Sequence, residues 1–540
     1  MPPLLPGLQP AAVDAAAADA GAGVRSESSQ VKHPEPPLVL VIDVGSSSVR
    51  ACLFDRHARP VEGMQATRKA TLHSAADGTA DEDPVALAEL VEGTVDETLH
   101  AAAALGTPVA AVAMDTLVFG ACGADAQGAP VTPVYTYADT RARREAIALR
   151  RELDFTAVYQ RTGCPLHTSY MPARVLWLAR TQPDLAARVR AWLPVGSLLY
   201  GRWFGVRAVP VSYSVASWSG MLDRHRLQWD AELRAHLHLP PDALPPLADY
   251  DHAQRGLAPA YAARWPALRD VPFFLAVGDG AAANVGSGCV IPTRVALTIG
   301  TTGAMRVMLP GATPRVPAGL WAYKVAAAET LLGGALSEGG NVFAWATSAL
   351  RLPPREQIED ALRALPPDGH GLTVLPFVAG ERSPGWCNDA EATIVGIHPA
   401  TTGLEVLQAC LEAVAYRLAI VARLLGPHVA ADHEIVASGG SLTASPYWIQ
   451  AIADLLGRRI RLSHSQELTS RGTAILALRA LGAWKTLDDE PLETETVFEP
   501  DPRRAATYQA ALERQHRVYE SLFGVDPDIG PSLAAAIRGA

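Results

Sequence analysis

Two segments of the chain share one pattern of apolar and polar positions. Residues 38–55, LVLVIDVGSSSVRACLFD, and residues 294–309, RVALTIGTTGAMRVML, each contain an apolar run, a turn of Gly with Ser or Thr, and a second apolar run. Apolar runs of this length beside such turn residues predict buried strands joined as a hairpin. Backbone N–H groups and small hydroxyls in a turn of this kind can surround a phosphate. The repetition predicts a phosphate chain that is held from two sides.

The residues after the first hairpin indicate an α/β domain. Residues 84–104 have apolar positions at helical spacing, and Val109–Met114 follows as a buried strand. Strands that alternate with helices in this order are typical of α/β folds. Between residues 140 and 270 the pattern is mixed, and it predicts no topology.

Two helices are predicted in the second half of the chain. Thr402 and Glu405 have capping-box spacing ahead of one apolar stripe. The pair Ser445–Pro446 supplies an N-cap and a first-turn proline for the other helix, which Gly457 ends. Residues 434–440, EIVASGG, predict a strand that leads into this second helix across a Gly-Gly turn. Glycine there would let a flat ligand approach the backbone.

Two acidic residues stand at predicted strand ends. Residues 273–277 predict a strand, and Asp279 follows it between Gly278 and Gly280. A carboxylate in this position can accept a proton from an attacking hydroxyl in phosphoryl transfer. Asp43 lies beside the first turn, where a carboxylate suits Mg²⁺ and its water shell. Taken alone, Gly-Asp-Gly is more often an ordinary turn; the order of the three motifs favours the chemical interpretation.

Length, charge and cysteine content restrict the class of protein. A chain of 540 residues exceeds one hydrophobic core, so two or more domains are expected. A net charge of −10 argues against a nucleic-acid partner. The six cysteines form no Cys-x-x-Cys pair, which argues against a disulfide framework or zinc site and favours a cytoplasmic location. No apolar run is long enough to span a membrane. Residues 1–36 lack the features of a signal peptide and are expected to form a disordered extension.

Taken in order, these motifs resemble the FGGY family of carbohydrate kinases from about residue 38 to 485. The matching segments are DVGSSSVR, PVYTYADTRA (133–142), GDGAAANVGSG, IGTTGAMRV, LPFVAGERSPGW (375–386) and SGGSLTASPYW (438–448). The resemblance implies an α/β fold of two actin/hexokinase/Hsp70-like (ribonuclease H-like) domains with a cleft between them. It divides the chain into an N-terminal domain, 37–288, a C-terminal domain, 289–485, and a helical tail, 486–540, that packs on the C-terminal domain.

The resemblance also implies the roles of individual residues. Asp279 is the expected catalytic base, and ATP with Mg²⁺ is the expected cofactor, with Asp43 and Asp279 on the metal. The residues expected to bind nucleotide are Ser46, Ser47, Ser48, Arg50, Gly300, Thr301, Gly339, Gly439 and Gly440. The residues expected to contact substrate are Val118, Phe119, Asp139, Ser169, Asp279 and Gly280.

The sequence departs from the family pattern around the expected substrate. Val118 and Phe119 stand where relatives commonly place polar residues, Met171 stands where gluconokinase-like members tend to carry an aromatic residue, and Tyr137 replaces a Trp. Either these side chains pack in the core of an altered loop, or they form an apolar wall that favours an acceptor less hydroxylated than gluconate.

Several other residues allow two interpretations each. Asp115 reaches substrate or caps a turn. Asp139 and Arg141 bind substrate or form an ion pair that braces the cleft, and Glu338 and Asn341 line the nucleotide side or belong to a surface loop. Glu381 and Arg382 are expected to brace the interdomain loop, and His398 and His464 to be structural.

The sequence therefore predicts an ATP-dependent kinase of a sugar or sugar acid, of gluconokinase-like type. A ketose or polyol kinase, similar to xylulokinase or ribulokinase, is the alternative within the enzyme class. A nucleotide- or sugar-binding regulator with the same fold is the alternative from another class. The expected partner is a small sugar or sugar acid, without nucleic acid or membrane; a homodimer is compatible with the sequence, which does not determine the oligomeric state.

Overall fold

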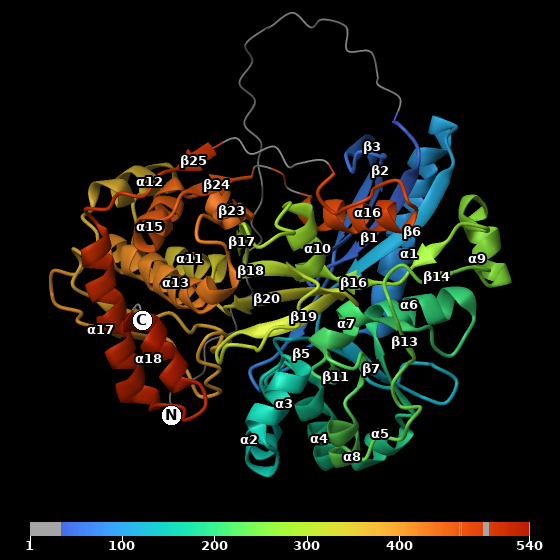
Figure 1. The fold of residues 1–540 in the computed structure, drawn as a ribbon, viewed down its shortest axis with the longest axis horizontal. Coiled ribbons are helices and arrows are strands. Elements are labelled where there is room, and N and C mark those ends of the chain that lie inside the picture. The colour runs from blue at the N-terminus through green and yellow to red at the C-terminus, as the bar shows by residue number, and fades with distance from the viewer. Residues whose placement is uncertain (1–33, 464, 466, 490–495, 539–540) are drawn as a thin grey trace, which may run out of the picture. The chain divides into compact units, whose positions relative to one another are not determined.

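The protein is described here from a computed structural model, which defines residues 34–463, 465, 467–489 and 496–538. Two mixed sheets of seven strands each form its framework (Figure 1). Residues 1–33 of the predicted extension, and His464, lie outside the described residues.

The first sheet is built on the predicted hairpin. Strand β1 (Leu38–Val44) is buried along its whole length; it pairs antiparallel with β2 (Ser48–Phe54) and parallel with β6 (Val109–Thr116). Both the hairpin and the following buried strand are confirmed. The sheet order is β14 (Ala253–Gln254), β15 (Phe273–Phe274), β6, β1, β2 and β3 (Pro60–Lys69), with β16 (Val277–Gly278) also paired to β6.

The second sheet repeats this arrangement. Strand β17 (Arg294–Ile299) pairs antiparallel with β18 (Gly303–Pro310) and parallel with β23 (Glu434–Ser438). The sheet order is β19 (Trp321–Ala326), β20 (Glu329–Ala335), β18, β17, β23, β24 (Ile460–Leu462) and β25 (Thr496–Phe498). In both sheets a hairpin strand is followed on one side by parallel strands that come later in the chain. The two similar sequence segments therefore occupy the same place in two similar sheets.

Long helices cover these sheets as their apolar stripes require. Helix α1 (Pro84–Ala102) packs on β2 and β3, and α13 (Gly403–Leu425) packs on β18 and β20. The predicted capping box of Thr402 and Glu405 begins α13. Helix α15 (Pro446–Leu456) has its N-cap at Ser445, as predicted, and lies against α13. The C-terminal helices α17 (Ala505–Phe523) and α18 (Gly530–Arg538) also pack on α13.

Two predicted elements differ in detail from the structure. The strand expected over residues 273–277 is interrupted at Leu275, whose N–H donates to the carbonyls of Tyr250 and His252 rather than to β6. The Gly-Gly turn after β23 does not lead directly into α15, because a short helix, α14 (Gly440–Thr443), lies between them. The N–H of Leu442, and those of the next two residues, donate to Gly439 and Gly440 and close this extra turn.

The segment that the sequence left without a topology folds as an insertion of short elements around the first sheet. Its helices are α2 (Arg143–Glu152), α3 (Phe155–Thr162), α4 (Met171–Thr181), α5 (Pro183–Arg188), α6 (Val195–Phe204), α7 (Tyr213–Trp218), α8 (Ala231–His236) and α9 (Pro259–Arg264).

A five-stranded sheet holds β4 (His73–Ser74), β5 (Ala80–Glu82), β8 (Val134–Tyr135), β7 (Ala121–Ala124) and β9 (Ala191–Pro194). Smaller pairs are β10 (Val211–Ser212) with β13 (Leu247–Ala248), β11 (Leu222–Asp223) with β12 (Gln228–Trp229), and β21 (Thr373–Leu375) with β22 (Thr393–Val395).

One helix crossing joins distant parts of the chain. Helix α10 (Asp279–Gly286) packs against α16 (Leu468–Ala480), which also lies on β1 and β6 (Figure 1). A Cβ atom built on Gly286 would stand 1.8 Å from the carbonyl oxygen of Leu468, and one on Gly472 would stand 1.8 Å from that of Ala282. The two backbones are therefore in direct contact, and only glycine fits at both positions.

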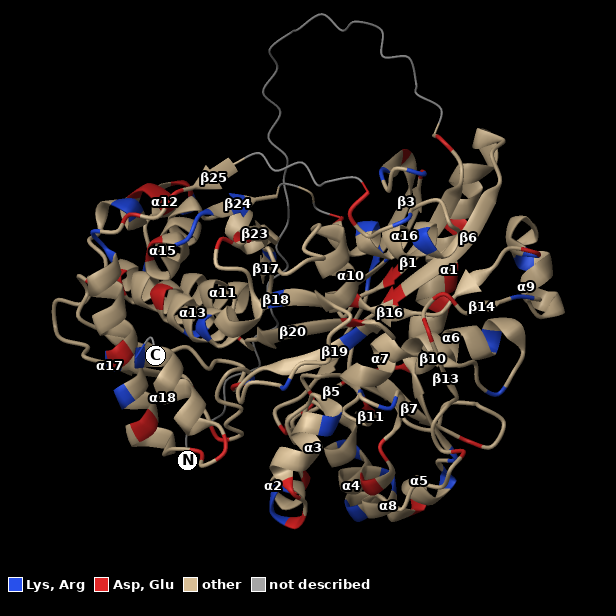
Figure 2. Ribbon diagram, in the orientation of Figure 1, with Lys and Arg blue, Asp and Glu red and all other residues tan. Residues whose placement is uncertain are grey.

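Three further features concern charge, cysteines and helix length. Acidic and basic residues are interspersed over the elements in Figure 2. All six cysteines are unpaired thiols. Within the described residues, every helix is too short or too polar to cross a bilayer.

Candidate active site

The first Gly-Ser turn joins β1 to β2. The N–H of Gly45 donates to the carbonyl of Ser48 at 3.0 Å, which closes the turn. Among the described residues, the N–H groups of Ser46 and Ser47 have no hydrogen-bond partner, and Ser47 is exposed. Two successive free N–H groups are what an anion requires of a turn.

The second turn, between β17 and β18, is braced from behind. The N–H groups of Gly340 and Asn341 donate to the carbonyls of Gly300 and Thr301 at 2.8 and 3.1 Å, and Ser441 Oγ also donates to Gly300. Gly340 begins helix α11 (Gly340–Ala349). Within the described part of the chain, the N–H groups of Thr301 and Thr302 have no partner, so this turn matches the first.

The predicted glycines on the nucleotide side gather around this second turn. Gly439 has φ of +104°, and a Cβ there would stand 2.3 Å from the carbonyl oxygen of Ile299. A Cβ on Gly339 would stand 2.6 Å from the backbone of Thr302. Gly440 has open space where a side chain would stand. The structure thus brings together Gly300, Thr301, Gly339, Gly439 and Gly440.

A pair of carboxylates lies at the carboxyl ends of β1 and β6. Asp43 and Asp115 face each other across the parallel register. Arg50 Nη1 lies 3.3 Å from Asp43 Oδ2. Helix α16 supplies two hydroxyl donors: Thr473 Oγ1 to Asp115 Oδ2 at 2.6 Å, and Ser470 Oγ to Asp43 Oδ2 at 3.4 Å.

Burial governs the ionisation of this pair. Loss of hydration raises the pKa of Asp43, and Arg50 offsets part of the rise. Burial, followed by the charge of Asp43, raises the pKa of Asp115 well above its usual range. Asp115 Oδ1 is buried without a partner among the described residues. Two adjacent carboxylates with an unsatisfied oxygen are a donor set that fits a hard cation.

Asp279 is the first residue of α10 and is partly accessible. Its Oδ1 accepts from the N–H of Gly280 at 2.6 Å. Burial raises the pKa of Asp279 to about 6, and the charge of Asp43 adds to the rise. The carboxylate is therefore ionised at neutral pH and more basic than an exposed aspartate, which suits a general base.

A cavity of about 1030 Å³ is lined on one side by the segments around β4–β5 and Tyr137, and on the other by the β17–β18 turn and residues 377–391. Its lining includes the second turn, the predicted substrate segment and the loop after β21, among them Tyr137, Ser169, Thr301, Asn341 and Arg382. Ser169 Oγ donates to the carbonyl of Tyr137 at 3.2 Å. The predicted residues Ser46–Ser48 lie on the β1–β2 turn beside Asp43 rather than on this lining.

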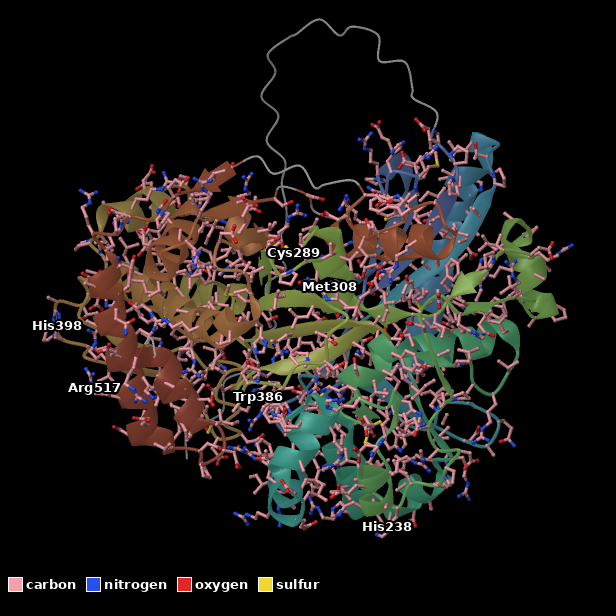
Figure 3. The ribbon with its side chains drawn as sticks, viewed as in Figure 1. His238, Cys289, Met308, Trp386, His398 and Arg517 are labelled. Atoms are coloured by element: carbon pink, nitrogen blue, oxygen red, sulfur yellow. The ribbon has the colours of Figure 1, made fainter. Side chains whose placement is uncertain are left out.

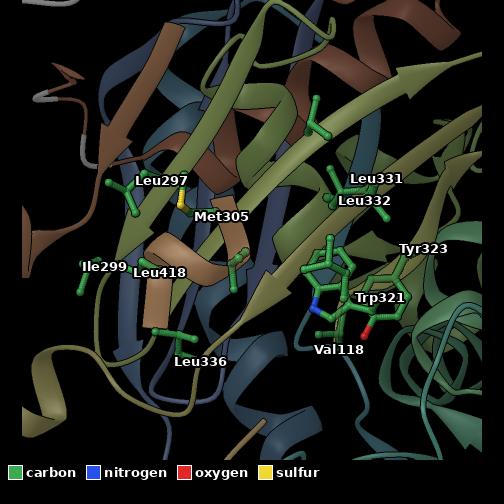
Figure 4. Packing of buried hydrophobic residues seen from close by; sticks show 14 of the residues in the cluster. Val118, Leu297, Ile299, Met305, Trp321, Tyr323, Leu331, Leu332, Leu336 and Leu418 are labelled. Atoms are coloured by element: carbon green, nitrogen blue, oxygen red, sulfur yellow. The ribbon is translucent and has the colours of Figure 1, made fainter. Parts of the chain in front are cut away.

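Aromatic rings surround Phe119 near Asp279. Its ring centroid lies 5.5 Å from that of Trp218 and 6.4 Å from that of Tyr137. Trp218 stacks on Tyr323. Tyr323 in turn stacks on Trp321 (Figure 4). Positions for Cβ atoms on Gly278 and Gly280 fall within 3 Å of the Trp218 indole. Phe119 is therefore connected to Asp279 through Trp218, and it is neither an isolated core residue nor on the lining of the large cavity.

Val118 and Met171, which the sequence grouped with Phe119, are more deeply buried than side chains that form the apolar wall of a pocket would be. Val118 is 8% exposed and packs against Gly278, while Met171 is 6% exposed and lies behind Phe119. Phe119 has φ of +66°, and Arg174 Nη1 donates to its carbonyl. The strained backbone and the buried arginine hold the ring in place.

The geometry distinguishes some of the paired interpretations. Arg141 forms ion pairs with Asp139 and with Asp81 Oδ2, the latter at 2.8 Å, which favours a bracing role for Asp139. Glu338 is fully buried, so the surface-loop alternative for this residue is wrong; burial raises its pKa to about 8. Asn341 lies in the first turn of α11, where its Oδ1 accepts from the N–H groups of Gly339 and Val342 at 2.8 and 2.9 Å.

Glu381 and Arg382 have separate environments. Glu381 forms a buried ion pair with Arg417 and accepts from Tyr519 Oη of α17 at 2.7 Å. Arg382 lines the cavity, with its guanidinium 5.0 Å above the Tyr137 ring. His398 lies on an exposed loop (Figure 3), where its Nδ1 accepts from the N–H of Ala400.

Four side chains at this site have no counterpart among the residues chosen from sequence: Trp218, Arg306, Ser470 and Thr473. Ser470 and Thr473 are hydroxyl residues one turn apart in the first half of α16, which was a weak signal. Arg306 is a charged residue inside the apolar strand that follows the second turn. That position within a buried strand was the stronger signal.

Comparison with known proteins decides the family. Residues 38–286 match the N-terminal domain, and residues 295–481 the C-terminal domain, of the FGGY family of carbohydrate kinases. The chain belongs to this family. The resemblance and the fold class predicted from sequence are both confirmed, and the chain is a carbohydrate kinase for which ATP use follows from the family.

Individual FGGY relatives span most of the chain. Gluconokinase of Bacillus subtilis (strain 168) is 24% identical over 466 residues, which cover 83% of this chain and 89% of the relative. Glycerol kinase of Leptothrix cholodnii is 29% identical, covering 89% of this chain and 98% of the relative. A crystal structure of gluconate kinase from Lactobacillus acidophilus has a TM-score of 0.83 at 23% identity, covering 92% of this chain and 99% of that one. The structural likeness shows the fold; the domain boundaries 37–288, 289–485 and 486–540 stay predictions.

Proposed function

We propose that this FGGY kinase transfers the γ-phosphoryl group of ATP to a hydroxyl of a sugar or sugar acid, as a gluconokinase-like member with Asp279 as general base. The observation that supports it most directly is the partly accessible Asp279 carboxylate, whose pKa is raised to about 6 at the start of α10. Similarity to the gluconokinases of two Bacillus species supports a gluconokinase-like acceptor.

In this proposal the two turns bind the phosphates. The unpaired N–H groups of Ser46 and Ser47 act from one sheet, and those of Thr301 and Thr302 act from the other. Ser48 and Arg50 support the first turn, and the glycines around the second turn leave room for the nucleoside. Binding from both sides aligns the γ-phosphoryl group with the acceptor, and alignment is a large part of phosphoryl-transfer catalysis.

The proposed metal is Mg²⁺, held by Asp43 with Asp115 and Asp279 close by. The unpartnered oxygen of Asp115 and the mutual effect of the two carboxylates on their pKa values support this choice. When bound, the ion supplies positive charge to the phosphate oxygens. Thr473 and Ser470 hold the carboxylates in place, and Arg50 limits their repulsion.

The chain's own residues then handle the proton. Asp279, ionised at neutral pH, orients the acceptor hydroxyl and accepts its proton as the oxygen attacks. The rings of Trp218 and Phe119 exclude water from one side of this carboxylate. Closure of the two domains would remove the remaining water, which otherwise competes as phosphoryl acceptor.

The pH dependence of turnover follows from Asp279. A base acts only when deprotonated, so kcat/KM is expected to rise with pH through about 6, the pKa of this carboxyl. Below that value, activity should fall about tenfold per pH unit. Initial rates of ADP release between about pH 5 and about pH 8 measure the profile. A profile that stays flat through this range would contradict the assignment of Asp279 as base.

The acceptor is decided by a coupled ADP-release assay with aldonates, ketoses and polyols. Turnover with aldonates alone supports the gluconokinase-like proposal. Turnover with ketoses or polyols supports the alternative, a ketose or polyol kinase. The similarity of this chain to glycerol kinases and to a xylulose kinase structure is in line with that alternative. Tight ATP binding without turnover of any acceptor would instead favour a regulator. The cytoplasmic location and a homodimer stay predictions.

A further inference from the structure

Two arginines near Asp279 have buried guanidinium nitrogens that make no hydrogen bond within the described part of the chain. Arg306 has its Nε and Nη1 buried without a hydrogen-bond partner among the described residues, and Arg382 has its Nε buried in the same way. Arg382 Nη2 donates to the carbonyl of Leu336, and its guanidinium lies over the Tyr137 ring. An unpaired buried guanidinium is costly. Two of them in one place indicate that an anion binds there.

The strand directs Arg306 towards Asp279. Gly303 and Gly334 face α13, where Cβ atoms on them would approach Leu418 and Val421. Arg306 lies on the opposite face of β18, paired with Gly333, where a Cβ would stand 3.1 Å from Arg306 Cγ. Because Gly333 has no side chain, there is room beside it for the side chain of Arg306.

The guanidinium ends beside the first turn of α10. The position of a Cβ on Gly280 lies 3.8 Å from Arg306 Nε and 2.9 Å from the Trp218 ring. Gly280 therefore separates the arginine from the indole, and the indole Nε1 is itself buried without a partner among the described residues. Burial lowers the pKa of Arg306 to about 10, while Asp279 opposes that change, so Arg306 is charged at neutral pH.

We propose that Arg306, assisted by Arg382, binds the carboxylate of the acceptor and selects sugar acids over neutral sugars and polyols. This inference rests on the proposed function, because it assigns a substrate class to the same site. The γ-phosphoryl group of ATP is the other anion that this pair could bind. Arg306 is four residues beyond Thr302, so its backbone lies about 13 Å along the strand from the second turn. The turns already offer free N–H groups to phosphate, so the acceptor carboxylate is the anion that remains.

The test compares an acid with its neutral analogue of the same chain length. Binding of D-gluconate and of the neutral polyol D-glucitol to the full-length protein is measured by calorimetry without ATP, and kcat/KM is measured by ADP release. For Arg306→Met we expect affinity for the bound acid to fall about 10- to 100-fold, since a charge-assisted hydrogen bond is lost. Binding of D-glucitol and of ATP should change less than about threefold. Arg306→Lys should restore part of the affinity for the acid.

Arg461→Met is the matched control. Arg461 lies in β24 of the same sheet, also has a buried Nε without a partner among the described residues, and pairs with Glu434 at 3.2 Å, away from Asp279. The Arg461→Met variant should therefore bind both the acid and the polyol as the wild-type protein does.

The outcomes separate this inference from the proposed function. Equal use of acids and polyols by the wild-type protein, unaffected by Arg306→Met, would overturn the inference and leave a kinase. A higher Kd for ATP in Arg306→Met, with acid binding intact, would also overturn it and assign the arginine to phosphate. Acid binding that depends on Arg306 without turnover of any acceptor would support the inference while the proposed function fails.

Discussion

Asp279→Asn lowers kcat by about 10²–10⁴-fold, the usual contribution of a general base. Asparagine keeps the size of the side chain and its hydrogen bond from the N–H of Gly280. It cannot accept a proton from the acceptor hydroxyl. Since the proposed phosphate contacts belong to the turns at Ser46–Ser47 and Thr301–Thr302, ATP affinity should change little. The measurements are ADP release under saturating acceptor and calorimetry with ATP.

A control variant separates chemistry from folding. Asp125→Asn changes a carboxylate in an exposed loop that accepts from the nearby backbone N–H groups of Gln127 and Ala129. It should retain full turnover. If Asp279→Asn also retained turnover, another residue would have to take the proton, and the mechanism proposed for this site would be wrong.

Gly472→Ala is expected to destabilise the protein by about 3 kcal/mol or more, at the top of the range for overpacked positions. The added Cβ would stand 1.8 Å from the carbonyl oxygen of Ala282, and backbone atoms cannot rotate away as a side chain does. Helices α10 and α16 must therefore separate. Their separation moves Asp279 relative to Ser470 and Thr473, and misplacement by about 1 Å can cost about 10²-fold in rate. Urea unfolding and kcat measure the two effects.

Gly426→Ala provides the comparison. Gly426 has helical φ and ψ, and a Cβ there meets nothing within 4 Å. Alanine at such a position is expected to stabilise by about 0.4–1 kcal/mol because it restricts the unfolded chain. Unchanged stability and activity in Gly472→Ala would show that α10 and α16 can shift without disturbing the site, contrary to the backbone contact in the structure.

Elements with strong local signals were predicted well. The hairpins β1–β2 and β17–β18, the capping box at Thr402 and the N-cap at Ser445 all depend on residues within one or two turns of each other. Side-chain periodicity and turn chemistry act over such short stretches. The interruption at Leu275 was not predicted. It arises because the N–H of Leu275 donates to carbonyls in the loop at Tyr250, and no local sequence pattern indicates such a contact.

The candidate site was predicted only in part, for the same reason. Asp43 and Asp279 stand beside glycines at strand ends, which the sequence displays. Ser470 and Thr473 come more than 350 residues after the carboxylates that they contact, as the bond from Thr473 to Asp115 shows. Phe119 was assigned from a departure in sequence pattern, but its ring contacts with Trp218 and Tyr137 required the fold.

By itself the sequence determined that two phosphate-type turns, each after a buried strand, flank a carboxylate, and that these motifs follow the order of the FGGY family. Those features are encoded by neighbouring residues, so the chain displays them directly. Tertiary structure alone decided that Arg306 ends beside Gly280 with two buried nitrogens that make no hydrogen bond to the described residues, and that α16 returns to hold Asp43 and Asp115. Packing brings together side chains from distant segments, and burial then sets their charge and reactivity. Local sequence patterns contain neither effect.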